Sequence, residues 1–140
     1  MLENLDLRFW IKRLLFGKNK SNAWLRGMRG ESKARKFLKK KGLRIVAKNW
    51  RAGRGEVDVI CLDSEVLVFV EIRSRSETAS VTGYHSVGLK KKKILKKTCL
   101  AYLDGLAKRP CSYRFDIVDV VLSDEKEDEV YHYENIPLFG

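Results

Sequence analysis

Apolar residues recur with a helical period in two stretches of the chain. The first covers residues 23–41, and Gly42 follows it as a C-terminal stop. The second covers residues 86–103, where the apolar positions alternate with a run of lysines. The pattern predicts a helix over each stretch. The side chains expected to face the core are Trp24, Met28, Ala34, Phe37 and Leu38 in the first helix, and Leu95, Thr98, Ala101 and Tyr102 in the second.

Between and after these helices, short apolar runs rich in valine and isoleucine are typical of strands. The predicted strands are one over 43–51, a hairpin over 54–75, a valine-rich strand over 113–122 and a last short strand within 129–136. The order is therefore helix, three strands, helix, and one or two strands. This order indicates a layered α/β or α+β domain.

The N-terminal extension, residues 1–22, has a pattern of its own. Residues 5–16 place apolar side chains on one side of a short helix and basic side chains on the other. Such a helix either contacts an acidic membrane surface or a partner, or packs on its own domain, which is the commoner arrangement. No apolar run reaches the roughly 20 residues of a membrane span, and acidic Glu3 and Asp6 do not fit a signal peptide. We therefore expect a cytoplasmic protein whose single domain is residues 23–140.

The charge of the chain is strongly basic. The sequence has 29 Lys and Arg against 18 Asp and Glu, a net charge of +11, although the stretch 124–129 is acidic. A basic surface favours a polyanionic partner, most often nucleic acid, because lysines and arginines that neutralise phosphates release counterions. The alternative is an ordinary solvated lysine-rich surface, and composition does not decide between them.

The hairpin carries acids where its strands would otherwise be apolar. If residues 64–65 form a two-residue turn, Asp58 faces Glu71 and Glu56 faces Arg73. Two facing carboxylates repel each other unless a cation lies between them, and Mg²⁺ or Mn²⁺ prefers oxygen ligands of this kind. The alternative is that Arg73 bridges the acids in an ordinary charge network. A shift of the register by one residue would also place Asp58 and Glu71 on opposite faces.

Other kinds of site have little support in the sequence. The three cysteines, at positions 61, 99 and 111, are widely spaced, and we expect them to be buried free thiols. Two histidines make no zinc cluster, and neither a nucleophile elbow nor a phosphate-binding loop is present.

Several motifs, spread over residues 28–139, resemble those of a known family. They are GESKARKFL, GLRIVAKNWR, GEVDVI, VFVEIRSRS, the lysine-rich helix followed by AYL, and RFDIV. The pair GEVDVI and VFVEIRSRS looks like the core of the PD-(D/E)xK nucleases, which restriction enzymes and archaeal Holliday-junction resolvases share. The chain as a whole more closely resembles the YraN family of uncharacterised bacterial proteins. The resemblance implies a restriction-endonuclease-like α/β core of three layers, with a mixed sheet flanked by helices.

The resemblance also implies roles for individual residues. Glu31 would be the acid on the first helix, and Asp58 and Glu71 would be the paired ligands of Mg²⁺ or Mn²⁺, with Glu31 holding a metal-bound water or a second ion. Arg73 occupies the position usually held by a catalytic lysine. Lys91 matches a basic position in the following helix, where it would contact a phosphate.

Two functions follow as expectations. The first is a metal-dependent nuclease acting on DNA, with branched or processed intermediates as candidate substrates; the second is a nucleic-acid-binding protein that keeps the fold without turnover. Arg73 favours the second, because an arginine cannot accept a proton. A homodimer is a further expectation, because the junction resolvases act as dimers. The residues expected to follow the nucleic-acid backbone are Arg54, Arg75, Lys90, Lys91, Lys93 and Lys97.

Overall fold

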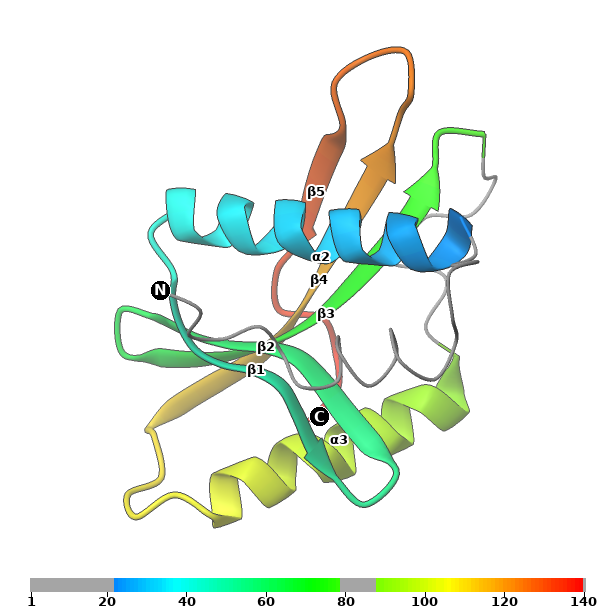
Figure 1. The fold of residues 1–140 in the computed structure, drawn as a ribbon. Helices are drawn as coiled ribbons and strands as arrows, with labels where there is room; N and C mark the ends of the chain where they lie inside the picture. Colours follow the sequence, from blue (N-terminus) through cyan, green and yellow to red (C-terminus); the bar gives the residue numbers. More distant parts are fainter. Residues whose placement is uncertain (1–21, 79–87, 140) are drawn as a thin grey trace, which may run out of the picture.

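A computed structural model describes residues 22–78 and 88–139 of the chain. Within these ranges lie two helices and five strands (Figure 1). In chain order they are α2 (Asn22–Lys40), β1 (Arg44–Ala52), β2 (Gly55–Asp63), β3 (Val66–Ser76), α3 (Leu89–Asp104), β4 (Ser112–Leu122) and β5 (Glu129–Tyr133). The predicted order of elements is confirmed. The expected helix over residues 5–16 and the first residues of the expected second helix lie outside the described residues.

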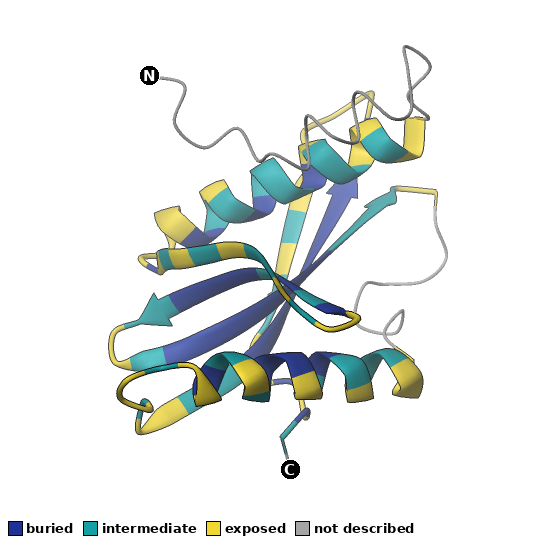
Figure 2. Cartoon of the chain, turned by 60° about the horizontal axis from the view of Figure 1, so that its bottom comes forward, coloured by how far each residue is buried: buried dark blue, intermediate teal, exposed yellow. Residues whose placement is uncertain are grey.

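The five strands form one mixed sheet in the order β1-β2-β3-β4-β5. All neighbours are antiparallel except β3 and β4, which are parallel because the chain crosses over through α3 between them. Helix α2 covers one face of the sheet and α3 covers the other (Figures 1 and 2). The expected fold class, an α/β core of the restriction-endonuclease type with a mixed sheet between helices, is confirmed.

Each face of the sheet has its own apolar core, and the strands between them are the most deeply buried part of the structure (Figure 2). Buried residues of the α2 core include Ala34, Leu38, Val59, Val68, Val70, Ile72, Val118 and Val120. Those of the α3 core include Val57, Ile60, Phe69, Leu95, Cys99, Leu103, Phe115 and Ile117. Alternate residues of β3 and β4 therefore serve opposite layers, as the period of two residues along a strand requires.

Two expectations about burial are wrong. Ala101 is exposed, and Cys99 and Leu103 face the core instead, because the phase of α3 turns the 95, 99 and 103 positions inward. Cys111 is also exposed, since it lies in the connection just before β4, whereas Cys61 and Cys99 are buried free thiols as predicted.

Local backbone geometry agrees with the sequence at both predicted chain reversals. Gly42 has φ of 100°. The amide of the following residue, Leu43, donates to the carbonyl of Leu38, and this hydrogen bond caps the C-terminal end of α2. Ser64 has φ of 53° in the β2–β3 turn. That turn sets the predicted register, in which Asp63 lies opposite Val66.

Strands β2 and β3 separate halfway along their length. Their pairing runs from the turn only to Val59 and Val70, whereas β3 continues beside β4 to its end at Ser76. In Figure 1 the two strands diverge from this point, β3 toward α2 and the β1–β2 hairpin toward α3. We call the opening between them the fork. The β1–β2 register shifts between Ile45 and Ala47, and Asn49 of β1 has a positive φ of 48°.

On each arm of the fork, a glycine lies where a helix and a strand come close together. A Cβ at Gly30 of α2 would lie 1.6 Å from Ser74 Oγ of β3. A Cβ at Gly55 of β2 would lie 1.7 Å from Thr98 Oγ1 of α3. Only glycine permits these two approaches. Helix α2 is thereby packed against the β3 arm, and α3 against the hairpin arm.

Neither of the helices in the described ranges is long and apolar enough to pass through a lipid bilayer.

Candidate active site at the fork

The two acids predicted to face each other both lie at the fork, within electrostatic reach of each other. Asp58 of β2 and Glu71 of β3 each lie one position beyond the last β2–β3 pair, Val59 with Val70, where the two strands have begun to separate. Asp58 Oδ2 accepts a hydrogen bond of 2.7 Å from the backbone amide of Ile72 in β3. The side chain therefore spans the gap where the backbone pairing has stopped. This bond fixes the Asp58 carboxylate beside the residue that follows Glu71.

The fork concentrates negative charge. Burial raises the pKa of Asp58 well above its usual value, and the nearby charge of Glu71 raises it further. Glu31 and Glu56 add smaller contributions in the same direction, while the hydrogen bond from Ile72 opposes them. The Asp58 carboxylate thus lies within the electrostatic reach of three other acids.

Glu71 is the most deeply buried of these acids, with 5% of its side chain exposed. Two cations approach its Oε1 atom from different elements. Lys91 of α3 donates to it from 2.5 Å, and Arg73 Nη2 of β3 lies 3.4 Å away. Arg73 Nε is buried and has no hydrogen-bond partner. The contact of Glu71 with the lysine is therefore short and direct, and its contact with the arginine is longer.

Glu31 approaches the fork from the α2 side. Its Oε2 lies 3.7 Å from Arg35 Nη1, one helical turn further along α2. It lines a hollow of about 250 Å³ between α2 and the end of β3, together with Arg26 and Arg73. Glu31 is thus near enough to raise the pKa of Asp58, yet it also has a partner on its own helix.

The expected pairing of Glu56 with Arg73 is wrong. Because the β2–β3 register ends at Val59, it does not extend to these two residues. Glu56 lies opposite Arg51 on β1 instead, and accepts a 2.8 Å hydrogen bond from Arg51 Nε. Arg73 is left to interact with Glu71.

The chemistry of the fork fits a divalent cation held by two carboxylates. Among the described residues no three Asp, Glu, His or Cys side chains are arranged to hold a metal ion together. Mg²⁺, however, commonly uses only one or two carboxylates and completes its shell with water and phosphate oxygens. Asp58 and Glu71 supply such a pair. The pKa of Asp58 is raised first by burial and then by repulsion from Glu71, and a shared cation would relieve that repulsion. Participation of Glu31 stays a prediction.

Comparison with known proteins places the chain in a family. Residues 30–120 match the Uncharacterised protein family UPF0102. The chain belongs to this family. A UPF0102 protein of Lawsonia intracellularis is 34% identical over 110 residues, which are 79% of this chain and 83% of that protein. One from Chlorobaculum parvum is 35% identical over 111 residues (79% and 85%), and one from Persephonella marina 33% over 113 residues (81% and 93%). The resemblance inferred from the motifs is confirmed, and the matched region contains the whole fork.

The residues of this UPF0102 protein that were predicted to contact nucleic acid separate into two groups. Four of them are exposed: Arg54 on the β1–β2 turn, and Lys90, Lys93 and Lys97 on α3. Lys91 and Arg75 instead bind acids: Lys91 binds Glu71, and Arg75 Nε donates to Asp119 Oδ2 at 3.2 Å. Nucleic-acid contact by any of them stays a prediction.

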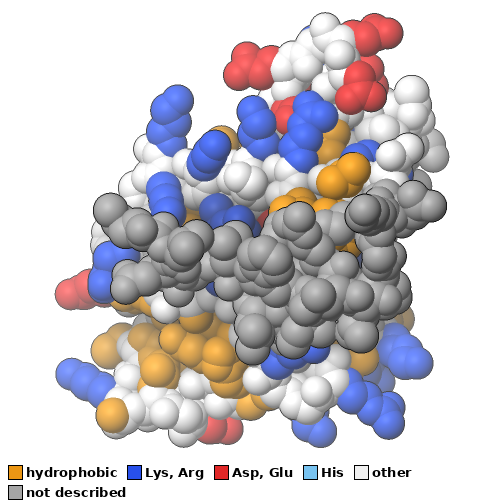
Figure 3. All heavy atoms as spheres, viewed as in Figure 1, with side chains coloured by type: hydrophobic (Ala, Val, Ile, Leu, Met, Phe, Trp, Pro, Cys, Tyr) orange, Lys and Arg blue, Asp and Glu red, His pale blue; other side chains and the backbone are white. Residues whose placement is uncertain are grey.

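Sequence reasoning missed a second basic surface of the UPF0102 chain, on α2. Figure 3 shows lysines and arginines along the outer side of this helix, below the acidic loop between β4 and β5. The exposed basic residues of α2 are Arg26, Arg29, Lys36, Lys39 and Lys40. The signal was present in the sequence, because these positions make up most of the polar side of the predicted first helix.

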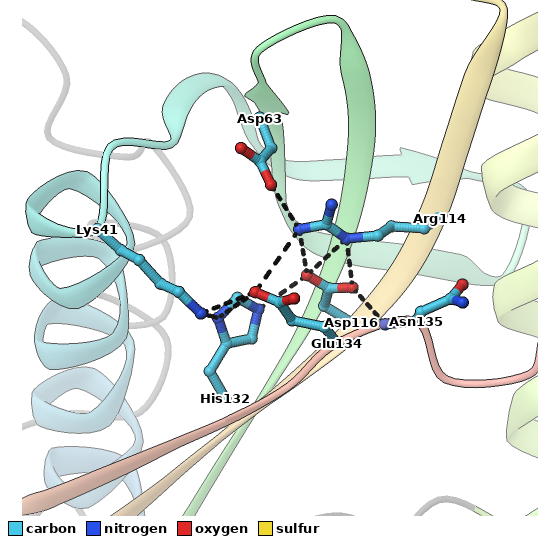
Figure 4. Close-up of polar contacts among 7 residues, drawn as sticks. All are labelled: Lys41, Asp63, Arg114, Asp116, His132, Glu134 and Asn135. Atoms are coloured by element: carbon cyan, nitrogen blue, oxygen red, sulfur yellow. Dashed lines mark hydrogen bonds and ion pairs between the residues drawn. The ribbon is translucent and has the colours of Figure 1, made fainter.

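A separate polar cluster surrounds Asp116 of β4 and is drawn in Figure 4. This buried carboxylate accepts hydrogen bonds from Arg114 Nε at 3.0 Å, from His132 Nε2 at 2.8 Å and from the amide of Asn135 at 2.9 Å. Burial alone would raise the pKa of Asp116, but the bonds from His132 and Arg114 outweigh it and lower the pKa. Since every bond is internal, the cluster is structural and joins β4 to β5.

Proposed function

We propose that this UPF0102 protein is a cytoplasmic, metal-dependent nuclease that hydrolyses phosphodiester bonds of DNA. The observation that supports the proposal is the meeting of Asp58 and Glu71 at the fork, where the pKa of Asp58 is raised by burial and by neighbouring acids. A partly buried acid with a strongly perturbed pKa, beside helices that carry basic residues, is typical of a functional position. The same acids are those that the PD-(D/E)xK resemblance implies.

Each side chain of the fork would have a different role in hydrolysis of the phosphodiester bond. Asp58 and Glu71 would hold Mg²⁺ or Mn²⁺, which when bound supplies a Lewis acid for the phosphate and an activated water. The amide of Ile72 keeps Asp58 oriented, and Arg73 donates hydrogen bonds to the negative charge that develops on the phosphate. Glu31, at the edge of the hollow, would orient a water on the α2 side.

Binding of the substrate would rest on the basic residues around the fork. Arg54 lies on the turn of the β1–β2 hairpin, and the exposed lysines lie on α3, which packs against that hairpin. Such residues contact phosphates and position the backbone without reading bases. Selectivity would therefore come from strand structure, which is why branched or processed DNA is the expected substrate.

A second candidate function is nucleic-acid binding without turnover. It is favoured by Arg73, which cannot accept a proton, and by the neutralisation of Glu71 by Lys91. This protein would have the same basic surfaces and the same salt-dependent affinity. The two candidates differ only in whether the phosphodiester bond is broken.

The test is a cleavage assay on labelled single-stranded, flapped and four-way DNA, with Mg²⁺, Mn²⁺ or EDTA. We expect divalent-dependent cleavage by the wild-type protein, and none by Asp58→Asn or Glu71→Gln, although both variants still bind DNA. Lys108→Met, a charge change at an exposed position after α3, is the control and should cleave normally. Salt-dependent binding without cleavage of any substrate would establish the second candidate instead.

A further inference from the structure

The ammonium group nearest to the fork acids comes from α3. Lys91 lies in the first turn of this helix, which follows β3 through the crossover connection. Its Nζ donates to Glu71 Oε1 over 2.5 Å, the shortest contact that this carboxylate makes in the described residues. Neighbouring Lys90 and Lys93 are exposed. Within a run of four lysines, Lys91 is therefore directed inward onto an acid.

This pair differs from an ordinary surface ion pair. Exposed pairs contribute little, because water screens both charges. Here the acid is buried, with 5% of its side chain exposed, while 42% of the lysine side chain remains accessible. A buried carboxylate requires a partner, and the partner in this case is itself only partly buried. The ammonium group can thus hold Glu71 and contact a ligand in the fork at the same time.

Arg73 is poorly suited to the same task. Its Nη2 is 3.4 Å from Glu71 Oε1, and its Nε is buried without a partner, so its planar group is not aligned with the carboxylate. An ammonium group is a compact charge with three donors on a flexible stem, which can point to two acceptors together. An ammonium group, which position 73 lacks, is therefore present at the fork and comes from Lys91 of α3.

We propose that Lys91 is a catalytic residue that provides from α3 the lysine function absent at position 73 of β3. Without metal, its ammonium group is the counter-ion of Glu71. With metal and DNA bound, it donates hydrogen bonds to the scissile phosphate and the attacking water. Lys91 transfers no proton in this step: the attacking water loses a proton to bulk water as its oxygen forms the new bond to phosphorus, and the leaving oxygen takes a proton from bulk water as its bond to phosphorus breaks. The proposal rests on the nuclease function proposed above.

The activity test moves the lysine from one element to the other. Lys91→Met keeps the length of the side chain but removes the charge, and we expect it to slow cleavage at saturating DNA by about 100-fold. Adding Arg73→Lys to this variant should recover about tenfold or more of the loss, because a lysine then reaches the fork from β3. Lys108→Met is the matched control and should cleave at the wild-type rate.

A second readout needs no cleavage. Mn²⁺ is titrated into the DNA-free protein, and its binding is followed by calorimetry. Lys91→Met should shift the isotherm to lower Mn²⁺ concentration, because the metal no longer competes with an ammonium group for Glu71. Glu71→Gln should shift it to higher concentration, and Lys108→Met should leave it unchanged.

The outcomes separate this inference from the proposed function. If the wild type cleaves, Asp58→Asn does not, and Lys91→Met cleaves normally, the role of Lys91 is overturned and the nuclease function stands. If Lys91→Met cleaves slowly but adding Arg73→Lys to it restores no activity, the claim that Lys91 replaces a lysine at position 73 is overturned. If the wild type cleaves no substrate, the nuclease function and the catalytic role fall together. An unchanged Mn²⁺ isotherm in Lys91→Met overturns the counter-ion role on its own.

Discussion

Gly30 of α2 lies directly against Ser74 of β3, so closely that a Cβ at position 30 would be 1.6 Å from Ser74 Oγ and 2.7 Å from Ser74 Cβ. The contact involves more than the flexible end of a side chain, so a larger residue cannot be accommodated without a shift of the helix. Because Glu31 is the next residue of α2, this contact also sets how close Glu31 lies to the fork.

Gly30→Ala should therefore destabilise the protein by about 1 to 3 kcal/mol through overpacking. Gly27→Ala is the matched control, since a Cβ there meets no atom within 4 Å. In that variant the better helix propensity of alanine should stabilise the protein by about 0.5 to 1 kcal/mol. Urea unfolding measures both. Equal effects of the two substitutions would contradict the close contact.

Asp58→Asn should raise stability while removing cleavage. At neutral pH the amide keeps an acceptor for the backbone of Ile72 but removes a buried charge that neighbouring acids disfavour. We expect a gain of about 1 kcal/mol in metal-free buffer. Thermal unfolding in EDTA measures it. A loss of stability would mean that the carboxylate is compensated better than the fork geometry indicates.

The exposed lysines of α3 should account for part of the salt dependence of DNA binding. Replacing Lys90, Lys93 and Lys97 by glutamine should reduce the slope of log K against log salt by about 0.9 for each phosphate that is no longer neutralised. The matched control replaces Lys36, Lys39 and Lys40, which are also exposed but lie in the C-terminal part of α2, beyond Glu31. Fluorescence anisotropy over a range of salt concentrations distinguishes the two surfaces. A larger effect of the control substitutions would mean that DNA binds to α2 instead of α3.

Asp116→Asn should destabilise the protein at neutral pH by about 2 to 4 kcal/mol, because it weakens bonds to Arg114 and His132. The pKa of Asp116 is lowered in the folded protein, so the stabilising effect of its charge is complete above its ordinary value of 3.8. It is lost as the pH falls through the lower folded-state pKa.

The difference in stability between wild type and Asp116→Asn should consequently be constant from neutral pH down to about pH 4 and shrink under more acidic conditions. Unfolding by urea at a series of pH values measures this difference. Asp104→Asn, at an exposed position near the end of α3, should show no such dependence. A difference that grows on acidification would contradict the direction of the pKa shift.

Local sequence patterns were sufficient to predict the elements and the central acid pair. The turn at Ser64 fixes the register of β2 and β3 as far as Val59 and Val70, and the next position outward on each strand is an acid, Asp58 or Glu71. The order of helices and strands followed from apolar periodicity, and the end of α2 from Gly42. These features depend on interactions between residues close together in the chain, which explains why sequence reasoning succeeded there.

Features that depend on the arrangement of distant elements were not predictable. The pairing of Glu56 with Arg73 was wrong because no sequence signal marks the divergence of β2 and β3 after Val59 and Val70. The contact between Lys91 and Glu71 depends on where the crossover connection places α3. No local pattern distinguishes Lys91 from the lysines beside it. The membrane, dimer and metal expectations stay predictions.

The divergence of β2 and β3 places the two acids on separate arms of the fork. The hairpin arm carries Asp58 and packs against α3 at Gly55. The β3 arm carries Glu71 and packs against α2 at Gly30. Any ion that binds both carboxylates must therefore link the two arms. A small change in the angle between the arms would decide whether both carboxylates can reach the same ion.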